Sequence, residues 1–203
     1  RYGFLAEAKR FEEPAKRLLI VSFSNWVAEV KAEAVLATAF RLQGWTPYVL
    51  TFSNYTRARR YFQACGIDRC VLLDQALSRV DGRAHTYADL AEKLLAKHNR
   101  FSSLLDLRFR DVYVGRHVLS TIVRNHRCGR VDLTDPRIAS SLRTCLAQSL
   151  QVVCAAERML DEVNPQLVLF LEKGYSPYGE VFDLAVNRGL NTIQWPHSHR
   201  ADA

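Results

Sequence analysis

The sequence has few of the features that mark membrane, secreted or zinc-binding proteins. Its longest apolar runs, such as LVLFL, are far shorter than the roughly 20 residues of a membrane-spanning helix. Five cysteines occur in 203 residues, and no two of them have the C-x-x-C spacing of a zinc site. An odd number of cysteines, mostly within apolar stretches, favours reduced thiols in a cytosolic protein over a disulfide framework.

Glycine is absent from the segment in which many nucleotide-binding proteins need it. The segment SFSNWVAE follows the first apolar run and contains neither the G-x-G-x-x-G fingerprint nor a lysine-bearing phosphate loop. This argues against NAD binding and ordinary ATP hydrolysis, and we expect no cofactor. Ser24 and Asn25 still precede an expected helix, whose N-terminal amides suit an anion.

The amino-terminal end also lacks the apolar core of a targeting signal. Because the sequence begins with Arg rather than Met, we expect the start of the gene to lie upstream.

Positive charge is in excess, with 28 Lys and Arg against 21 Asp and Glu. The segment from Arg100 to Arg130 contains seven arginines and two acidic residues, and Arg57, Arg59 and Arg60 form a second cluster. Such clusters indicate an anionic partner, which is phosphate, nucleic acid or the negative face of a membrane. A solvated basic face that only aids solubility gives the same pattern, and both interpretations stay open.

Apolar runs alternate with helical patterns along the chain. The expected strands cover residues 17–24, 46–53, 68–74, 166–172 and 191–195. Apolar strands joined through helices by short connections are typical of a parallel sheet covered by helices. The sequence therefore predicts an α/β fold, a Rossmann-like parallel sheet of about five strands flanked by helices.

The long segment 75–164 lacks strand signals, and we expect it to be a mostly helical insertion between the third and fourth strands. Its clearest helix begins where Thr134 or Asp135 caps it and Pro136 occupies the first turn. With a helical lead-in over residues 1–17, one Rossmann-like domain then accounts for residues 1–203.

Ligands of open parallel sheets bind outside the carboxyl ends of the strands. That rule selects the segments SFSNWVAE, FSNYTRARR, EKGYSPYGE and PHSHR. In the first of these segments, Ser24, Asn25 and Trp26 are candidates for substrate binding.

The segment EKGYSPYGE, residues 172–180, combines glycines with polar and aromatic side chains. Its glycines permit tight turns or the close approach of a ligand, its tyrosines can stack on a sugar or base, and Glu172 is a candidate general base. The binding candidates here are Lys173, Tyr175, Ser176, Tyr178 and Gly179. The alternative is a turn-rich connection with a buried tyrosine and a surface ion pair.

His197 and His199 follow the last expected strand with one residue between them. Two histidines alone do not complete a zinc site, which would also need Glu172 or a distant residue, so we expect no metal. One histidine can instead act on a hydroxyl or phosphate, with Arg200 as an anion contact. An exposed polar loop without a role is the third interpretation, and the residues do not decide between them.

Several segments together resemble a known family. These are LLIVSFS, DVYVGRHVLSTIVRNHRCG, and the long helix before NPQLVLFLEKGYSPYGEVFDLAVNRGLNTIQWPHSH. They are similar to the N-terminal half of GT-B-type glycosyltransferases, particularly bacterial enzymes of capsule and surface-polysaccharide biosynthesis. The positions that match the family pattern are Gly115, Ser120, Arg124, Gly174, Ser176 and Gly179.

The resemblance implies that this half binds the acceptor, with Arg124 among its substrate-binding residues. The acceptor would be a polysaccharide, lipid-linked or phosphorylated molecule, and the catalytic base would be Glu29, Glu172 or His197. The nucleotide-sugar co-substrate would bind a second Rossmann half, which we expect after residue 203 because the sequence stops where that half should begin. We expect a cytoplasmic protein with a peripheral contact at the inner membrane face.

Two other functions remain open. A non-catalytic Rossmann-like module could bind nucleic acid through its arginines, with an affinity that falls steeply with salt. The sequence lacks the recurrent aromatic platform of known nucleic-acid modules, which counts against this reading. A sugar-nucleotide epimerase of the same two-domain architecture would bind the nucleotide sugar without an acceptor.

Overall fold

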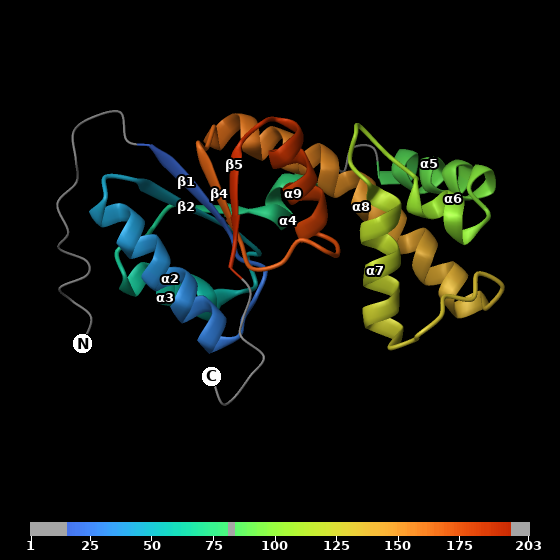
Figure 1. Ribbon diagram of the computed structural model, residues 1–203, viewed down its shortest axis with the longest axis horizontal. Helices are drawn as coiled ribbons and strands as arrows, with labels where there is room; N and C mark the ends of the chain where they lie inside the picture. The colour runs from blue at the N-terminus through green and yellow to red at the C-terminus, as the bar shows by residue number, and fades with distance from the viewer. Residues whose placement is uncertain (1–15, 81–83, 196–203) are drawn as a thin grey trace. The chain divides into compact units, whose positions relative to one another are not determined.

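The computed structural model describes residues 16–80 and 84–195 and shows an α/β fold around a five-stranded, all-parallel sheet (Figure 1). The strands are β1 (Arg17–Val21), β2 (Thr46–Thr51), β3 (Cys70–Leu72), β4 (Leu167–Phe170) and β5 (Asn191–Gln194). The predicted Rossmann-like fold class is confirmed.

The strand order is β3-β2-β1-β4-β5, so the direction in which strands are added reverses between β1 and β4. Leu18 of β1 is in register with Pro47 of β2 on one side and with Leu167 of β4 on the other. All four residues of β4 are buried, as expected for a parallel strand that is covered on both faces. The carboxyl ends of β1 and β4 form the topological switch point, where open α/β sheets bind ligands.

The chain forms two compact units. The sheet unit contains all five strands and, among the described residues, comprises 16–75, 159–171 and 189–195. The helical unit comprises the described residues of 76–158 together with 172–188. The loops after β1 and β2 therefore belong to the sheet unit, whereas the loop after β4 belongs to the helical unit.

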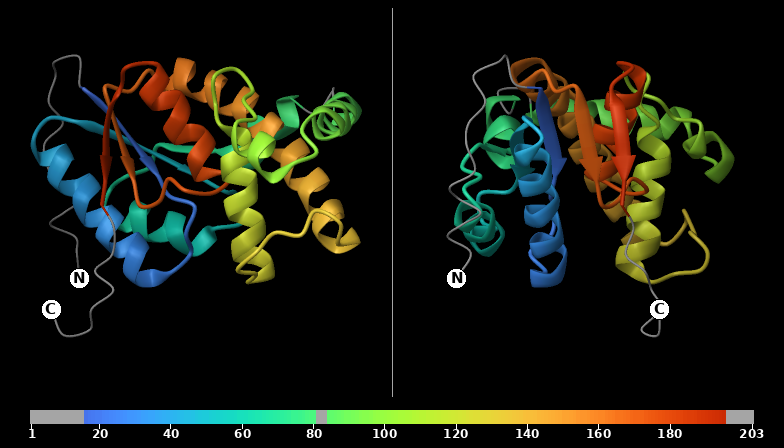
Figure 2. Two further views of the ribbon diagram at one scale, coloured as in Figure 1. Left: turned by 45° about the vertical axis from the view of Figure 1, so that its right-hand side comes forward. Right: turned by 60° about the vertical axis from the view of Figure 1, so that its left-hand side comes forward.

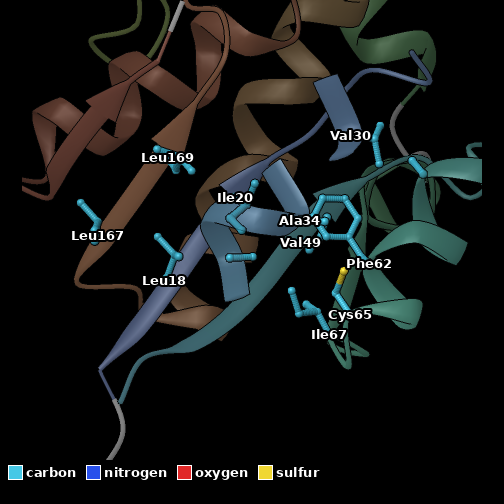
Figure 3. Packing of buried hydrophobic residues seen from close by; sticks show 12 residues of the cluster. Leu18, Ile20, Val30, Ala34, Val49, Phe62, Cys65, Ile67, Leu167 and Leu169 are labelled. Atoms are coloured by element: carbon cyan, nitrogen blue, oxygen red, sulfur yellow. The ribbon is translucent and has the colours of Figure 1, made fainter. Parts of the chain in front are cut away.

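In the sheet unit, helices α2 (Val27–Leu42) and α3 (Thr56–Ala64) pack on one face of the sheet (Figure 3). Leu18 and Ile20 of β1 meet Val30 of α2 and the fully buried Phe62 of α3 in this core. Both helices are followed by glycines with positive φ, Gly44 and Gly66. Leu42 is 54% exposed because it lies in the last turn of α2.

The helical unit is built from α5 (Ala84–Lys97), α6 (Phe101–Leu105), α7 (Val114–His126), α9 (Tyr178–Asn187) and most of α8 (Pro136–Val163). Helix α7 packs against both α6 and α9 (Figure 2). Gly115 allows α7 to approach α6 closely, because a Cβ atom at this position would lie 1.7 Å from the carbonyl oxygen of Leu104.

The helix boundaries agree with several expectations. Helix α7 spans the predicted residues, and Asp135 rather than Thr134 caps α8, because its carboxylate accepts the backbone N–H of Arg137 at 2.8 Å. Helix α4 (Leu73–Val80) and α6 were not expected.

The predicted helical lead-in falls outside the described residues except at its end, where Arg17 begins β1. The domain boundaries inferred from the sequence stay predictions. None of the described helices has the length and apolar character needed to cross a membrane.

Candidate functional site

The sheet unit has a buried carboxyl group beside the carboxyl end of β1. Ser22, directly after β1, donates its hydroxyl hydrogen to Oε2 of Glu33 at 2.5 Å, and both residues are fully buried. Burial raises the pKa of Glu33 to about 8; the Ser22 hydrogen bond opposes this rise and the negative charge of Glu29 adds to it. The Glu33 carboxyl group is therefore mainly protonated at neutral pH.

A second buried hydroxyl lies next to this pair. Val21 is in register with Leu50, so the following residues, Ser22 and Thr51, are neighbours across β1 and β2. Neither the Thr51 hydroxyl nor Oε1 of Glu33 has a hydrogen-bond partner among the described residues. The carboxyl edge of the sheet thus contains buried polar groups without hydrogen bonds, whose burial costs more free energy than the burial of apolar side chains.

The loop after β2 is hydrogen-bonded to the first turn of α4, which begins directly after β3. Ser53 donates its backbone N–H to Oδ1 of Asp74 at 2.9 Å, and its hydroxyl donates to the other carboxylate oxygen. Burial acts to raise the pKa of Asp74, but the hydrogen bonds from Ser53 and from the backbone of Asp74 and Gln75 together lower it. The contact with Asp74 holds the loop after β2 against the start of α4.

The predicted binding residues of the first loop form the start of α2. Oγ of Ser24 accepts the backbone N–H of Trp26 at 3.1 Å. Asn25 is exposed, and the Trp26 side chain is 75% exposed. Glu29 is partly buried one helical turn before Glu33, the carboxyl group whose pKa it raises.

The helical unit contains a second buried carboxyl group, on α9. Ser149 of α8 donates its hydroxyl hydrogen to Oε1 of Glu180 at 2.5 Å, and Glu180 is fully buried. Burial raises the pKa of Glu180, opposed by the charge of His117 and by hydrogen bonds from Ser149 and Ser176. Oε2 of Glu180 has no donor at full hydrogen-bonding distance among the described residues.

His117 of α7 connects this carboxyl group to a second one. Its Nε2 atom lies 2.9 Å from Oδ2 of Asp183, and the same oxygen accepts the backbone N–H of Tyr113 at 3.0 Å. Asp183 therefore fixes the orientation of the imidazole ring. The position of the ring also requires a glycine at residue 179, because a Cβ atom on Gly179 would lie 2.1 Å from Nδ1 of His117.

These buried groups hold the loop that precedes α9. The backbone N–H of Ser176 donates to Oγ1 of Thr121 on α7 at 3.0 Å, and the backbone N–H of Gly179 donates to the carbonyl of Tyr175 at 2.9 Å. The side chain of Ser176 adds its contact with Glu180. The loop thus has fixed attachments to α7 and α9.

Three predicted substrate-binding residues meet at this loop. The guanidinium group of Arg124 lies 4.1 Å from the ring centroid of Tyr175, and the ring of Tyr178 meets Tyr175 edge-on at 5.7 Å. Tyr178 is buried, whereas Tyr175 is partly exposed. The structure therefore brings together Arg124, Tyr175 and Tyr178, which are distant in the sequence or separated by a turn.

The remaining predicted site residues are more dispersed. Glu172 is partly buried, and the ammonium group of Lys173 lies 5.2 Å from the ring centroid of Phe182. Gly174 is exposed, and a Cβ atom there would meet nothing within 4 Å, so its side chain could be larger. His197, His199 and Arg200 lie outside the described residues.

Sequence reasoning missed three buried polar residues, Glu33, His117 and Glu180, and the partly buried Asp183. A signal for Glu33 was present, because it lies three residues after Val30 and four before Ala37, which are both buried. His117 similarly follows the buried Val114 by three residues. Neither residue was singled out as a core residue, because charged and polar residues are rarely found in cores.

No family model, curated protein or solved structure matches the chain. Among the described residues there is also no group of three or more His, Cys, Asp or Glu side chains placed to hold a metal ion.

Proposed function

We propose that the chain is the acceptor-binding half of a glycosyltransferase, which moves a sugar from a nucleotide-sugar donor to a polysaccharide, lipid-linked or phosphorylated acceptor. The proposal combines the family resemblance of the sequence with the contacts of the loop between β4 and α9.

The contact of Arg124, Tyr175 and Tyr178 carries the proposal. Aromatic rings pack against the C–H faces of sugars, and phenol and guanidinium groups donate hydrogen bonds to sugar hydroxyls. The attachment of Ser176 to Thr121 holds the loop in place without a ligand, so binding would cost little ordering entropy. A fixed loop with a partly exposed tyrosine suits a sugar-binding subsite.

The end of β1 supports the assignment of the donor to a different domain. A pyrophosphate cradle needs glycines that let the backbone approach the phosphates. Here the segment from Ser22 to Trp26 has none, and the buried pair of Ser22 and Glu33 occupies the strand end. The nucleotide sugar would bind the expected second Rossmann half.

Glu172 is the proposed general base. It belongs to the same loop as Tyr175, whereas Glu29 belongs to the sheet unit and interacts electrostatically with Glu33. Glu172 would accept the proton of the acceptor hydroxyl as the oxygen attacks the sugar carbon, and the nucleoside diphosphate would leave with the electron pair of the broken bond.

The test is to screen the chain on an array of bacterial oligosaccharides and to titrate the strongest binder by calorimetry. We expect oligosaccharide binding, no binding of UDP-glucose, and an affinity that falls about fivefold in Tyr175→Ala, because one stacking contact is lost. Tyr48→Ala is the matched control, since Tyr48 is also partly buried and lies 5.3 Å from a guanidinium group, that of Arg69.

The proposal fails if UDP-glucose binds and no oligosaccharide does. It also fails if Tyr48→Ala reduces oligosaccharide binding as much as Tyr175→Ala does.

A further inference from the structure

The exposed face of α7 carries a row of arginines. Arg116, Ser120 and Arg124 are all exposed and recur at intervals of four residues, the spacing of one helix face, and the exposed Arg127 directly follows the helix. Helix α7 contains no Asp or Glu that could neutralise these arginines.

Two of these arginines lie over tyrosine rings. The guanidinium group of Arg116 is 3.9 Å from the ring centroid of Tyr113, and that of Arg124 is 4.1 Å from the centroid of Tyr175. Arg108 lies 3.8 Å from the Tyr113 centroid, and two groups at such distances must occupy opposite faces of one ring. Stacking restricts the arginine side chains and leaves the in-plane N–H donors available for a ligand.

Few protein groups compete for these donors. The guanidinium group of Arg124 has no ion pair or hydrogen bond among the described residues. Arg116 donates from Nε to the carbonyl of Leu105 at 3.1 Å and lies 3.9 Å from a carboxylate oxygen of Asp106. Since both Arg116 and Asp106 are largely exposed, that ion pair is weak and an anion in solution can replace it.

The chemistry of the row matches phosphate. A guanidinium group presents two parallel N–H bonds to two oxygens of one phosphate, and stacking fixes its plane in advance. Arg116 and Arg124 are eight residues apart, or about 12 Å along the helix, so they can hold two phosphates or the ends of one extended ligand. Arginines cover both faces of Tyr113, so this ring offers no surface on which a nucleic-acid base could stack.

We infer that the exposed face of α7 is a phosphate-binding site in which Arg116 and Arg124 are the principal contacts. The inference rests on the proposed function in one respect, because it makes the acceptor a phosphate-bearing molecule. The phosphate could belong to a lipid headgroup or to a soluble sugar phosphate, which share the chemistry that the arginines recognise.

Two assays distinguish these sources. In the first, the chain is sedimented with phosphatidylcholine vesicles that contain or lack phosphatidic acid. In the second, it is titrated by calorimetry with glucose 1-phosphate and with glucose. We expect binding to the phosphate-bearing probe in at least one assay, and the assay that shows it identifies the source.

The test variant is the double substitution Arg116→Gln with Arg124→Gln. Both side chains are exposed, so the fold should be retained, and we expect phosphate-dependent binding to fall about 25-fold, or fivefold for each arginine. The control is Lys31→Gln with Arg69→Gln, which removes the same charge from two exposed basic residues of the sheet unit that also lie over tyrosine rings. Its binding should stay within twofold of the wild-type value.

Three results would overturn the inference. The first is that neither phosphate probe binds. The second is that both double variants lose binding equally, which would show a general charge effect. In the third, single-stranded DNA binds more tightly than either probe and depends on the same arginines, which would make nucleic acid the ligand. Oligosaccharide binding on the array is measured separately, so its persistence without phosphate binding would refute only the phosphate site.

Discussion

The two buried glutamates, Glu33 of the sheet unit and Glu180 of the helical unit, share one local arrangement in different surroundings. Each accepts a serine hydroxyl at 2.5 Å, and each has a second oxygen without a hydrogen bond at full distance among the described residues. The charged neighbour of Glu33 is Glu29, which raises its pKa, whereas that of Glu180 is His117, which lowers it.

The difference shows that burial sets the direction of a pKa shift and the neighbour modifies it. Burial is the largest cause for both carboxyl groups, and both pKa values are raised. Glu180 belongs to a network that reaches the loop before α9 through Ser176, and it has His117 beside it. A serine–glutamate pair thus lies at the sheet edge in one unit and beside the loop before α9 in the other.

Replacing Glu33 should give the largest effect. In the folded chain Glu33 keeps its proton up to about pH 8, whereas the ordinary pKa of a glutamate is 4.5, so folding binds a proton between these values. The free energy of unfolding must then fall as pH rises from 4.5 to about 8, by up to roughly 5 kcal/mol.

Glu33→Gln should remove this part of the pH dependence, which urea unfolding at pH 5 and pH 8 would measure. The control is Glu162→Gln, which removes an exposed carboxylate of α8. Equal pH dependence in the wild type and Glu33→Gln would show that the buried carboxyl group does not titrate as inferred.

A methyl group at Gly179 should displace the imidazole ring of His117, which lies beside Glu180. The Cβ atom of Gly179→Ala would overlap the His117 ring, which Asp183 holds in place, and we expect a loss of about 2 kcal/mol in the free energy of unfolding. Gly174→Ala, on the same loop, meets nothing within 4 Å and should change it by less than about 0.5 kcal/mol. If urea unfolding gives equal values for both variants, the imidazole ring is not fixed.

The smallest change should follow from removing the like charge beside Glu33. Glu29→Gln eliminates a negative charge one helical turn away, so the pKa of Glu33 should decrease by a few tenths. Titration of the carboxyl carbon by NMR measures this decrease, and added salt should diminish it. An unchanged or higher pKa of Glu33 in this variant would show that the charge of Glu29 does not raise it.

Most of the fold was predictable because the sequence repeats one pattern. The apolar runs that became β1 and β4, and the periodicity of α7, carry enough signal to place the elements within a few residues. Helices α4 and α6 were not predicted because each is short, and because α4 begins directly at the end of β3 without a turn. Local sequence cannot indicate that a strand ends by continuing as a helix.

The site was predictable in its composition but not in its contacts. Arg124 and Tyr175 were both named as binding residues, yet their stacking depends on how α7 packs against α9. Glu33 and Glu180 look like ordinary helix-surface residues, since what distinguishes them is the serine that each meets from a distant segment. Tertiary structure decides such pairings.

The register of β1 with β4 has a consequence for the nascent chain. β1 pairs with β2 soon after both are synthesised, but its other edge stays open until β4 emerges, because Leu18 is in register with Leu167. At roughly 5–20 residues per second, a ribosome needs on the order of ten seconds to make the intervening segment. During that time β1, whose last four residues are buried in the folded sheet, has one unpaired edge, so aggregation on the ribosome is most favoured before the helical unit is complete.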